Sequence, residues 1–187
     1  MKKETEIKIE LGTESFLRLK KILFDLGARQ VSSFNERTYG FFTPDRKSIK
    51  EGIFPRIKVF NKNKEGILTV KIKKQKKTKY FQRNEFSLLI SNVKNARDVL
   101  CTLGYSKERI FDKKREIWKF KKKDIEICLD KLPFGNYVEI EGKPKEIEKT
   151  IKKLKLERYK RITKAYLAVY DEWRKKNNVK SENAIFE

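Results

Sequence analysis

The 187-residue chain contains no histidine, and this absence limits its chemistry more than any other feature of its composition. Histidine is the commonest general base in proteins and the commonest ligand of transition metals. Acid–base or metal chemistry in this chain must therefore use carboxylate, lysine, tyrosine or thiol groups. A zinc site is disfavoured for the same reason, whereas Mg²⁺ and Mn²⁺ bind oxygen ligands and are compatible with the composition.

Cysteine is also scarce. Cys101 and Cys128 lie too far apart in the sequence to form a CxxC motif. We therefore expect two free thiols in a reducing compartment rather than a disulfide or a zinc site. The sequence contains no apolar run long enough to cross a membrane, and it does not open with a charged and then apolar leader. These absences predict a soluble, cytoplasmic protein without a membrane partner.

Acidic residues are few: the chain has 26 Asp and Glu but 48 Lys and Arg, which gives a net charge of +22. A charge of this size predicts a polyanionic partner: nucleic acid, an anionic membrane or a phosphate-rich small molecule. The alternative is a solvated, lysine-rich surface. The composition still predicts a folded domain, because 38% of the residues are hydrophobic and 13 Phe, 7 Tyr and 2 Trp supply a large apolar core.

Hydrophobic periodicity and turn residues predict four helices and eight strands. Thr13 and Thr163 are expected to cap the first and fourth helices, Asn92 to start the second and Pro144 to open the third. The strands are expected at residues 2–11, 30–42, 54–61, 66–74, 79–90, 106–120, 124–132 and 136–142. Residues 1–176 are predicted to form a single domain, and residues 177–187 a loose polar tail.

The stretch ETEIK shows a pattern that recurs on most of the predicted strands. Glu4, Glu6 and Lys8 alternate with Thr5 and Ile7, so this strand has one charged face and one apolar face. Charges share a face in the same way at Arg56 and Lys58, Lys71 and Lys73, Arg83 and Glu85, Lys113 and Arg115, Glu126 and Asp130, and Glu139 and Glu141. On an ordinary half-buried strand such a face contacts water.

The helices indicate which way the charged faces point. Amphipathic helices pack against apolar sheet faces, and each strand has only one such face, so that face must point outward. Closing eight strands removes the exposed edges and places the charged faces around a lumen. This predicts an α+β fold: a closed eight-stranded antiparallel β-barrel that forms a tunnel, with helices packed outside. Charges in a tunnel need partners, which a metal cation and a polyphosphate would supply.

The same motifs resemble, in order, those of the CYTH family, the triphosphate tunnel metalloenzymes. ETEIK resembles the Glu-x-Glu-x-Lys signature of this family. The later motifs that resemble it are PRIK, LTVK, QRNE, DKKREIW, ICLDKLPFGNYVEIEG and KAYLAVY, so the similarity covers roughly residues 2–173. Lys58 departs from the family, which often has a second arginine there and so a bidentate phosphate contact. The loop KKQKKTKY is also unusually basic, and the family pattern gives it no role.

The resemblance implies a metal-dependent attack on a triphosphate, and strand geometry is consistent with it. Neighbours on one face of a strand lie about 6.6 Å apart, close enough for glutamates to converge on one cation. The predicted ligands of Mg²⁺ or Mn²⁺ are Glu4, Glu6, Glu139 and Glu141. The predicted triphosphate contacts are Lys8, Arg56, Lys58, Lys71, Lys73, Arg83 and Arg115. The alternative for both sets is a solvated strand face.

Three of the tunnel residues are candidate catalytic groups. These are Lys8, Lys71 and Asp130, and Asp130 is either a metal ligand or the partner of one. A glutamate or a neutral lysine would assist proton removal, and the sequence does not single out one of them. The stripe of Tyr166, Tyr170 and Trp173 is predicted to belong to the core, with closure of one tunnel mouth as the alternative.

The first predicted function is a divalent-metal-dependent, class IV adenylyl cyclase-like reaction in a basic tunnel, which converts ATP to cyclic AMP and pyrophosphate. The alternative within the family is hydrolysis of inorganic tripolyphosphate, thiamine triphosphate or a nucleoside triphosphate. The sequence does not separate the two, because the phosphate-binding residues serve both. A homodimer is left open.

Two further alternatives come from other classes of protein. A basic nucleic-acid-binding barrel would use KKQKKTKY with Tyr80 and Phe81. It gives no reason for paired glutamates on two strands, so nucleic acid is not the expected partner. The last alternative is a catalytically silent module that binds polyphosphate, which the mild departures from the family motifs do not favour.

Overall fold

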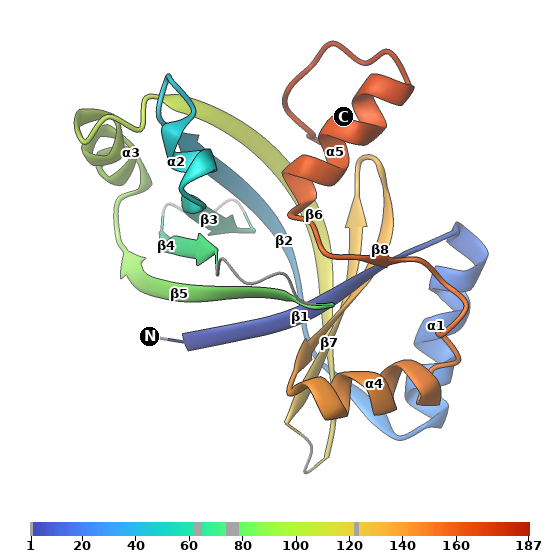
Figure 1. Ribbon diagram of the computed structural model, residues 1–187. Coiled ribbons are helices and arrows are strands. Elements are labelled where there is room, and N and C mark those ends of the chain that lie inside the picture. The colour runs from blue at the N-terminus through green and yellow to red at the C-terminus, as the bar shows by residue number, and fades with distance from the viewer. Residues whose placement is uncertain (1, 62–64, 74–78, 122–123) are drawn as a thin grey trace.

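The strands of the computed structural model close into a barrel (Figure 1). The structure describes residues 2–61, 65–73, 79–121 and 124–187 of the chain. The strands are β1 (Lys2–Leu11), β2 (Ala28–Phe42), β3 (Ile53–Phe60), β4 (Gly66–Lys73), β5 (Phe81–Ile90), β6 (Lys107–Phe120), β7 (Ile125–Leu132), β8 (Gly135–Gly142) and β9 (Arg161–Ile162). The predicted eight-stranded antiparallel barrel is confirmed, and the two-residue β9 is an addition beside β1.

The order of strands around the barrel is β5–β4–β3–β2–β6–β7–β8–β1, and β1 pairs with β5 to close it. The N-terminal half of β1 pairs with β5, and its C-terminal half pairs with β8 and β9. Where the partners change, Glu4 lies opposite Arg83 and Glu6 lies opposite Glu141. Barrel closure therefore brings the glutamates of β1 and β8 together with an arginine of β5.

Five helices surround the strands within the described residues: α1 (Thr13–Asp25), α2 (Lys47–Lys50), α3 (Val93–Thr102), α4 (Pro144–Lys153) and α5 (Tyr166–Lys176). Asn92 caps α3 as predicted, because its side chain accepts a hydrogen bond from the Asn95 N–H at 3.0 Å. α1 and α5 begin differently from the prediction, since Gly12 and Ala165 occupy their N-cap positions instead of threonines. The four-residue α2 is too short to show a hydrophobic period and was not predicted.

The apolar faces of the strands point outward to these helices (Figure 1). α1 and α4 cover β1, β7 and β8 through a buried cluster that includes Ile7, Ile9, Leu19, Leu23, Ile127, Ile140, Ile147 and Ile151. α5 and α3 cover other parts of the barrel through two further clusters. Each fully buried side chain of this size contributes about 1.5–3 kcal/mol. This packing fixes the outward face of each strand and so leaves the charged faces inside.

Residues 182–186 lie against β6, so this part of the segment expected to be a loose tail is held in place. Ala184 is buried, its N–H donates to the Ile110 carbonyl at 2.9 Å, and the Asp112 N–H donates to the Ala184 carbonyl at 2.8 Å. The Tyr170 hydroxyl on α5 lies within hydrogen-bond distance of two more carbonyls of the segment. Backbone hydrogen bonds hold this segment in place. Because residues of almost any type can make such bonds, the polar sequence did not predict them.

Both cysteines are free, as predicted. Cys101 is exposed on α3, whereas Cys128 is buried on β7. Burial raises the pKa of the Cys128 thiol well above its usual value, so it is a protonated thiol and not a nucleophile. None of the described helices is long and apolar enough to cross a membrane.

Candidate active site

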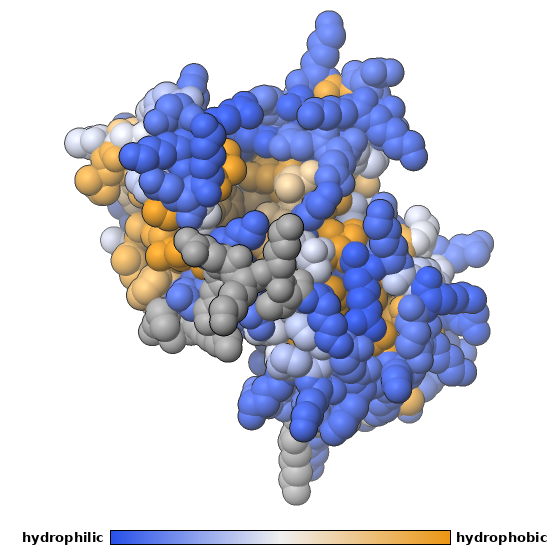
Figure 2. All heavy atoms as spheres, viewed as in Figure 1, coloured by the Kyte–Doolittle hydropathy of each residue, from blue (hydrophilic) through white to orange (hydrophobic). Residues whose placement is uncertain are grey.

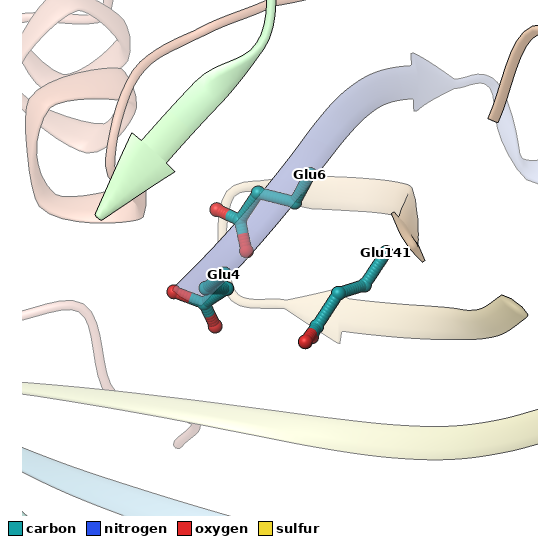
Figure 3. A group of neighbouring side chains, drawn as sticks. All are labelled: Glu4, Glu6 and Glu141. Carbon is teal, nitrogen blue, oxygen red and sulfur yellow. The ribbon is translucent and has the colours of Figure 1, made fainter. Parts of the chain in front are cut away.

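Three glutamates from two neighbouring strands point toward one another in the tunnel wall (Figure 3). Glu4 and Glu6 alternate on β1, and Glu141 lies opposite Glu6 on β8. One carboxylate oxygen from each of the three lies within 4.8 Å of the other two. Glu4 and Glu6 are buried, and Glu141 is half-buried. We call these three residues the acidic trio.

The acidic trio has the donor chemistry of a Mg²⁺ or Mn²⁺ site. Both cations prefer oxygen ligands, and Mg²⁺ keeps several coordination positions for water or phosphate oxygens. Three carboxylates at this separation repel one another unless cations compensate them. The oxygen-only donor set and its geometry are sufficient for this fit. The residues present therefore fit a hard divalent cation.

Glu139, the fourth predicted metal ligand, is not one of the acidic trio, and Lys8 links it to the trio by pairing with Glu6 as well. It pairs with Lys8 at 2.9 Å and also with Arg115. Arg115 forms a two-pronged pair with the fully buried Asp130, at 2.6 Å from Nε to Oδ1. The Tyr166 hydroxyl donates to the other Asp130 oxygen at 2.8 Å. Asp130 is thus engaged by Arg115 and Tyr166, and it orients Arg115 rather than joining the acidic trio.

Basic side chains from β3, β4 and β5 lie next to the acidic trio. Lys71 Nζ is 2.6 Å from Glu4 Oε2, and an Arg83 terminal nitrogen is 3.4 Å from Glu6 Oε1. The Nε atoms of Arg56 and Arg83 are buried and have no hydrogen-bond partner within the described residues. Burial, followed by the charges of Arg56 and Arg83, lowers the pKa of Lys71 to about 8. Unsatisfied buried donors and crowded cations are both relieved by a bound anion.

Lys58 continues the basic lining beyond Arg56. Burial, followed by repulsion from Arg56, lowers the pKa of Lys58 to about 8. Glu36 lies nearby on β2, with an oxygen 3.3 Å from Lys113 Nζ. Burial alone would raise the pKa of Glu36, but the charges of Lys113 and Lys58 lower it to about 2. This part of the tunnel therefore holds charged groups at neutral pH, with a lysine close to losing its proton.

The tunnel encloses a cavity of about 210 Å³, and its described lining is balanced in charge. The cationic side chains are Lys8, Arg56, Lys58, Lys71, Arg83, Lys113 and Arg115. The anionic side chains are Glu4, Glu6, Glu36, Glu85, Glu126, Glu139 and Glu141. Seven positive and seven negative charges cancel, so the excess of +22 lies outside this lining. The expectation of a basic tunnel is corrected: the lining becomes net positive only when a cation neutralises part of it.

Lys73, one of the predicted triphosphate contacts, lies outside the tunnel cavity. It is exposed and lines a second cavity, the mouth pocket, whose other lining residues include Phe42, Phe54, Leu167 and Ala168. Lys73 is the last residue of β4. Lys71 and Lys73 share one face of β4, but Lys71 lines the tunnel whereas Lys73, at the end of the strand, lines the mouth pocket.

Among the charged residues that line the tunnel in the described part of the chain, the sequence did not predict Glu36. Glu36 has only uncharged neighbours on its own face of β2, Phe34 and Thr38, so the alternation of charges gave no signal there. Tyr166 belongs to a buried core cluster, as predicted, and it also faces the tunnel, with Lys8 Nζ 5.2 Å from the centre of its ring. Its position at the first residue of α5 places it at the end of the barrel. Tyr170 is buried in the same cluster, and Trp173 packs against it, as predicted for core residues.

The structure does not favour the nucleic-acid-binding alternative, which would use the rings of Tyr80 and Phe81 for base stacking. Residues 74–78 of the KKQKKTKY loop lie outside the described part of the chain. Tyr80 is buried, and its hydroxyl lies 2.7 Å from a Glu148 carboxylate oxygen. Phe81 lies against the guanidinium of Arg83, 4.2 Å from its ring centre. Base stacking needs accessible ring faces, and of these two rings Phe81 alone lines a cavity, the mouth pocket.

The sequence model of the CYTH domain matches residues 2–167 of the chain. The chain belongs to the CYTH family. Membership of this family implies a triphosphate substrate and a divalent metal. The acidic trio and the adjacent cations are the parts of this CYTH domain that fit such a pair of ligands.

Solved structures share the fold of this CYTH domain. The PH1819 protein from Pyrococcus horikoshii OT3 is 27% identical with a TM-score of 0.73, over 90% of this chain and 98% of that one. A putative adenylate cyclase from Vibrio parahaemolyticus is 17% identical with a TM-score of 0.67, over 90% and 97%. A putative adenylyl cyclase from Hippeastrum, described as having a dominant triphosphatase activity, is 14% identical with a TM-score of 0.67, over 92% and 96%. The comparison with curated proteins found no significant match.

Proposed function

We propose that this protein is a metal-dependent enzyme that breaks a phosphoanhydride bond of a triphosphate inside its tunnel. The observation that carries the proposal is the placement of the acidic trio next to buried cations in one cavity of about 210 Å³. A solvated strand face does not need this arrangement, because water would satisfy each charge separately. A metal and a polyphosphate satisfy both groups at once.

The acidic trio would hold Mg²⁺ or Mn²⁺. When bound, such a cation supplies charge neutralisation for phosphate oxygens. The binding of the two ligands is expected to be cooperative, because the described lining carries no net charge until the trio is neutralised. The metal therefore makes the tunnel attractive to the polyanion.

The basic residues bind and orient the phosphate chain. Arg56 and Arg83 have buried Nε atoms that lack a partner within the described chain, and they present these donors to phosphate oxygens. Asp130 and Tyr166 hold Arg115 in place through its two-pronged pair. Phosphoryl transfer depends mainly on such positioning and on charge stabilisation in the transition state.

Adenylyl cyclisation is the first candidate reaction, as in the sequence analysis, and hydrolysis of a triphosphate is the second. In cyclisation the ribose 3′-oxygen bonds to the α-phosphorus, pyrophosphate leaves and the hydroxyl proton is released. In hydrolysis water bonds to the terminal phosphorus and the remaining diphosphate leaves. Both reactions use the same phosphate-binding residues and differ in which nucleophile is held in line.

The products identify the reaction. We expect purified protein with Mg²⁺ or Mn²⁺ to consume ATP, and chromatography of the mixture to show cyclic AMP and pyrophosphate for a cyclase. Orthophosphate from ATP, thiamine triphosphate or tripolyphosphate would identify a hydrolase instead. A reaction with EDTA in place of the metal is the control. If none of these compounds is consumed with either metal at neutral to alkaline pH, the enzymatic proposal is wrong.

The pH dependence is expected to report on Lys58. Its pKa of about 8 means that its ammonium group is charged below pH 8 and loses its charge as the pH rises. Only the charged form attracts phosphate, so kcat/KM should fall on the alkaline side. The charged groups that act on it are Arg56, Glu36, Lys113 and Glu85.

Replacing Lys58 by arginine separates its contribution from that of Lys71, whose pKa is also about 8. The wild-type plot of log kcat/KM against pH should approach a slope of about −2 above pH 8, since two lysines titrate. Lys58→Arg keeps its charge at all these pH values, so the slope should fall to about −1. Superimposable profiles for the two proteins would contradict this role for Lys58.

A further inference from the structure

The mouth pocket is a cavity of about 440 Å³ beside one end of the tunnel. Strand ends, among them those of β2, β4 and β6, supply much of its lining. Part of the rest comes from α2 and α5, which face each other across the top of the barrel in Figure 1. Figure 2 shows a hollow with apolar walls between these hydrophilic elements. A volume of this size is typical of sites for small organic molecules.

The mouth pocket adjoins the tunnel. Phe54, Arg83, Ala165 and Leu167 line both cavities. Arg83 is also 3.4 Å from Glu6 of the acidic trio. A molecule whose phosphates lie at the trio would therefore have its remaining part next to Arg83, at the entrance to the mouth pocket.

Aromatic and aliphatic side chains form the walls of the pocket. Phe42 and Phe54 stack with ring centres 5.4 Å apart and an interplanar angle of 27°. Gly40 makes room for this arrangement, because a Cβ atom there would lie 2.8 Å from the ring of Phe54. Ile49 and Leu167 complete the apolar lining. Flat apolar walls of this kind favour an aromatic ring over a hydrated, purely ionic group.

The charges at the rim select against a cationic ring. The basic lining residues are Arg46, Lys73, Arg83, Lys107 and Arg109, and the acidic ones are Glu108, Asp171 and Glu182. Five positive and three negative charges leave a net charge of +2. Each of the three carboxylates is paired with an arginine: Glu108 with Arg97, Asp171 with Arg109 and Arg174, and Glu182 with Arg174. These carboxylates are already compensated, so a cationic ligand would meet net repulsion.

We propose that the mouth pocket binds the neutral aromatic ring of an organic triphosphate, which makes a nucleoside triphosphate the preferred substrate. This inference rests on the proposed function of the tunnel and specifies its substrate class. Thiamine triphosphate fits less well because its thiazolium ring is cationic. Inorganic tripolyphosphate fits the tunnel but leaves the apolar walls of the pocket in contact with water.

The test is a binding measurement by titration calorimetry with Ca²⁺ in place of Mg²⁺, so that turnover is suppressed. The three probes are ATP, thiamine triphosphate and tripolyphosphate. ATP is expected to bind at least about 10-fold more tightly than either of the others, since ring burial and charge each contribute on the order of 1–3 kcal/mol. Thiamine triphosphate that binds as tightly as ATP would overturn the inference.

A variant that fills the pocket tests its location. Ala168 is exposed on α5 and lines the mouth pocket, so Ala168→Trp introduces a bulky side chain there without disturbing the core. It should weaken ATP binding about 10-fold and change tripolyphosphate binding less than about 2-fold. The matched control is Lys176→Trp, an exposed position of the same helix that does not line the pocket. Equal effects of Ala168→Trp on both probes, or none on ATP, would overturn the inference.

The binding readout separates the two proposals. A protein that binds ATP through the mouth pocket but consumes no triphosphate with Mg²⁺ or Mn²⁺ would refute the proposed enzymatic function alone. A protein that hydrolyses tripolyphosphate but shows no preference for ATP would refute the neutral-ring pocket alone. Circular dichroism of both tryptophan variants verifies that they are folded.

Discussion

Replacing Glu6 or Glu141 by glutamine is expected to lower kcat/KM for the triphosphate by at least about 100-fold. Both residues belong to the acidic trio, whose carboxylate oxygens lie within 4.8 Å of one another. Glutamine keeps the size of the side chain and one carbonyl oxygen but removes the negative charge that holds a hard cation. The loss should be partly recovered at high Mg²⁺ concentration, because weaker binding of the cation is the cause.

Metal binding gives a second readout that does not depend on the reaction. Titration with Mn²⁺ should show at least about 10-fold weaker binding to either variant than to the wild type. Triphosphate binding in the presence of metal should weaken as well, since the described tunnel lining has no net charge without it.

The matched control is Glu10→Gln. Glu10 lies on the same strand as the trio, but its side chain is exposed and does not line the tunnel. This variant should retain wild-type activity and metal binding. Near-normal activity of both trio variants at ordinary Mg²⁺ concentration would show that the metal assignment is wrong.

The barrel and the orientation of its strands could be predicted because both depend on a period of two residues. Glu4, Glu6 and Lys8 alternate with apolar residues, and the helices require the apolar side. The structure places these residues inside as predicted, and the apolar Ile7 and Ile9 in the core against α1 and α4. The inward or outward direction of each side chain follows from strand geometry alone, so it could be predicted from the sequence.

The grouping of the charges within the tunnel could not be predicted in the same way. Parity places both Glu139 and Glu141 on the inner face, but only pairing between strands decides which one meets Glu6. The register sets Glu141 opposite Glu6 and Glu139 opposite Lys8. Glu139 therefore joins the ion pairs and Glu141 joins the acidic trio. Register depends on contacts between distant segments, and a single strand carries no record of it.

Contacts made by helix ends and by backbone atoms were also beyond the sequence analysis. The period of α5 assigns Tyr166 to a buried face, but not to the tunnel end where its hydroxyl meets Asp130. Ala184 pairs with β6 through its backbone, and any residue type can make such bonds. The mouth pocket likewise depends on α2, which is too short for a hydrophobic period to reveal it.

Arg56→Gln is expected to lower kcat/KM by about 10²–10³-fold while leaving the free protein as stable as the wild type or more so. The activity falls because a fixed donor to the phosphate chain is lost. The stability does not fall, because Arg56 has an Nε atom buried without a partner in the described residues. Its repulsion of Lys58 and Lys71 also offsets its attraction for the carboxylates of Glu4, Glu36 and Glu85. Its nearest described carboxylate, on Glu85, is 4.0 Å away, so no close ion pair is broken.

Thermal unfolding with and without tripolyphosphate and Mg²⁺ measures both effects. The variant should unfold at the wild-type temperature or above it without ligand, and it should lose most of the stabilisation that the ligands give to the wild type. Arg37→Gln is the contrasting control, because Arg37 is a surface residue that forms a two-pronged pair with Asp112 at 2.7 and 2.8 Å. That variant should lose up to about 1 kcal/mol of stability and keep its activity. An Arg56→Gln protein that is less stable than the wild type but equally active would place Arg56 among the structural residues and remove it from the phosphate site.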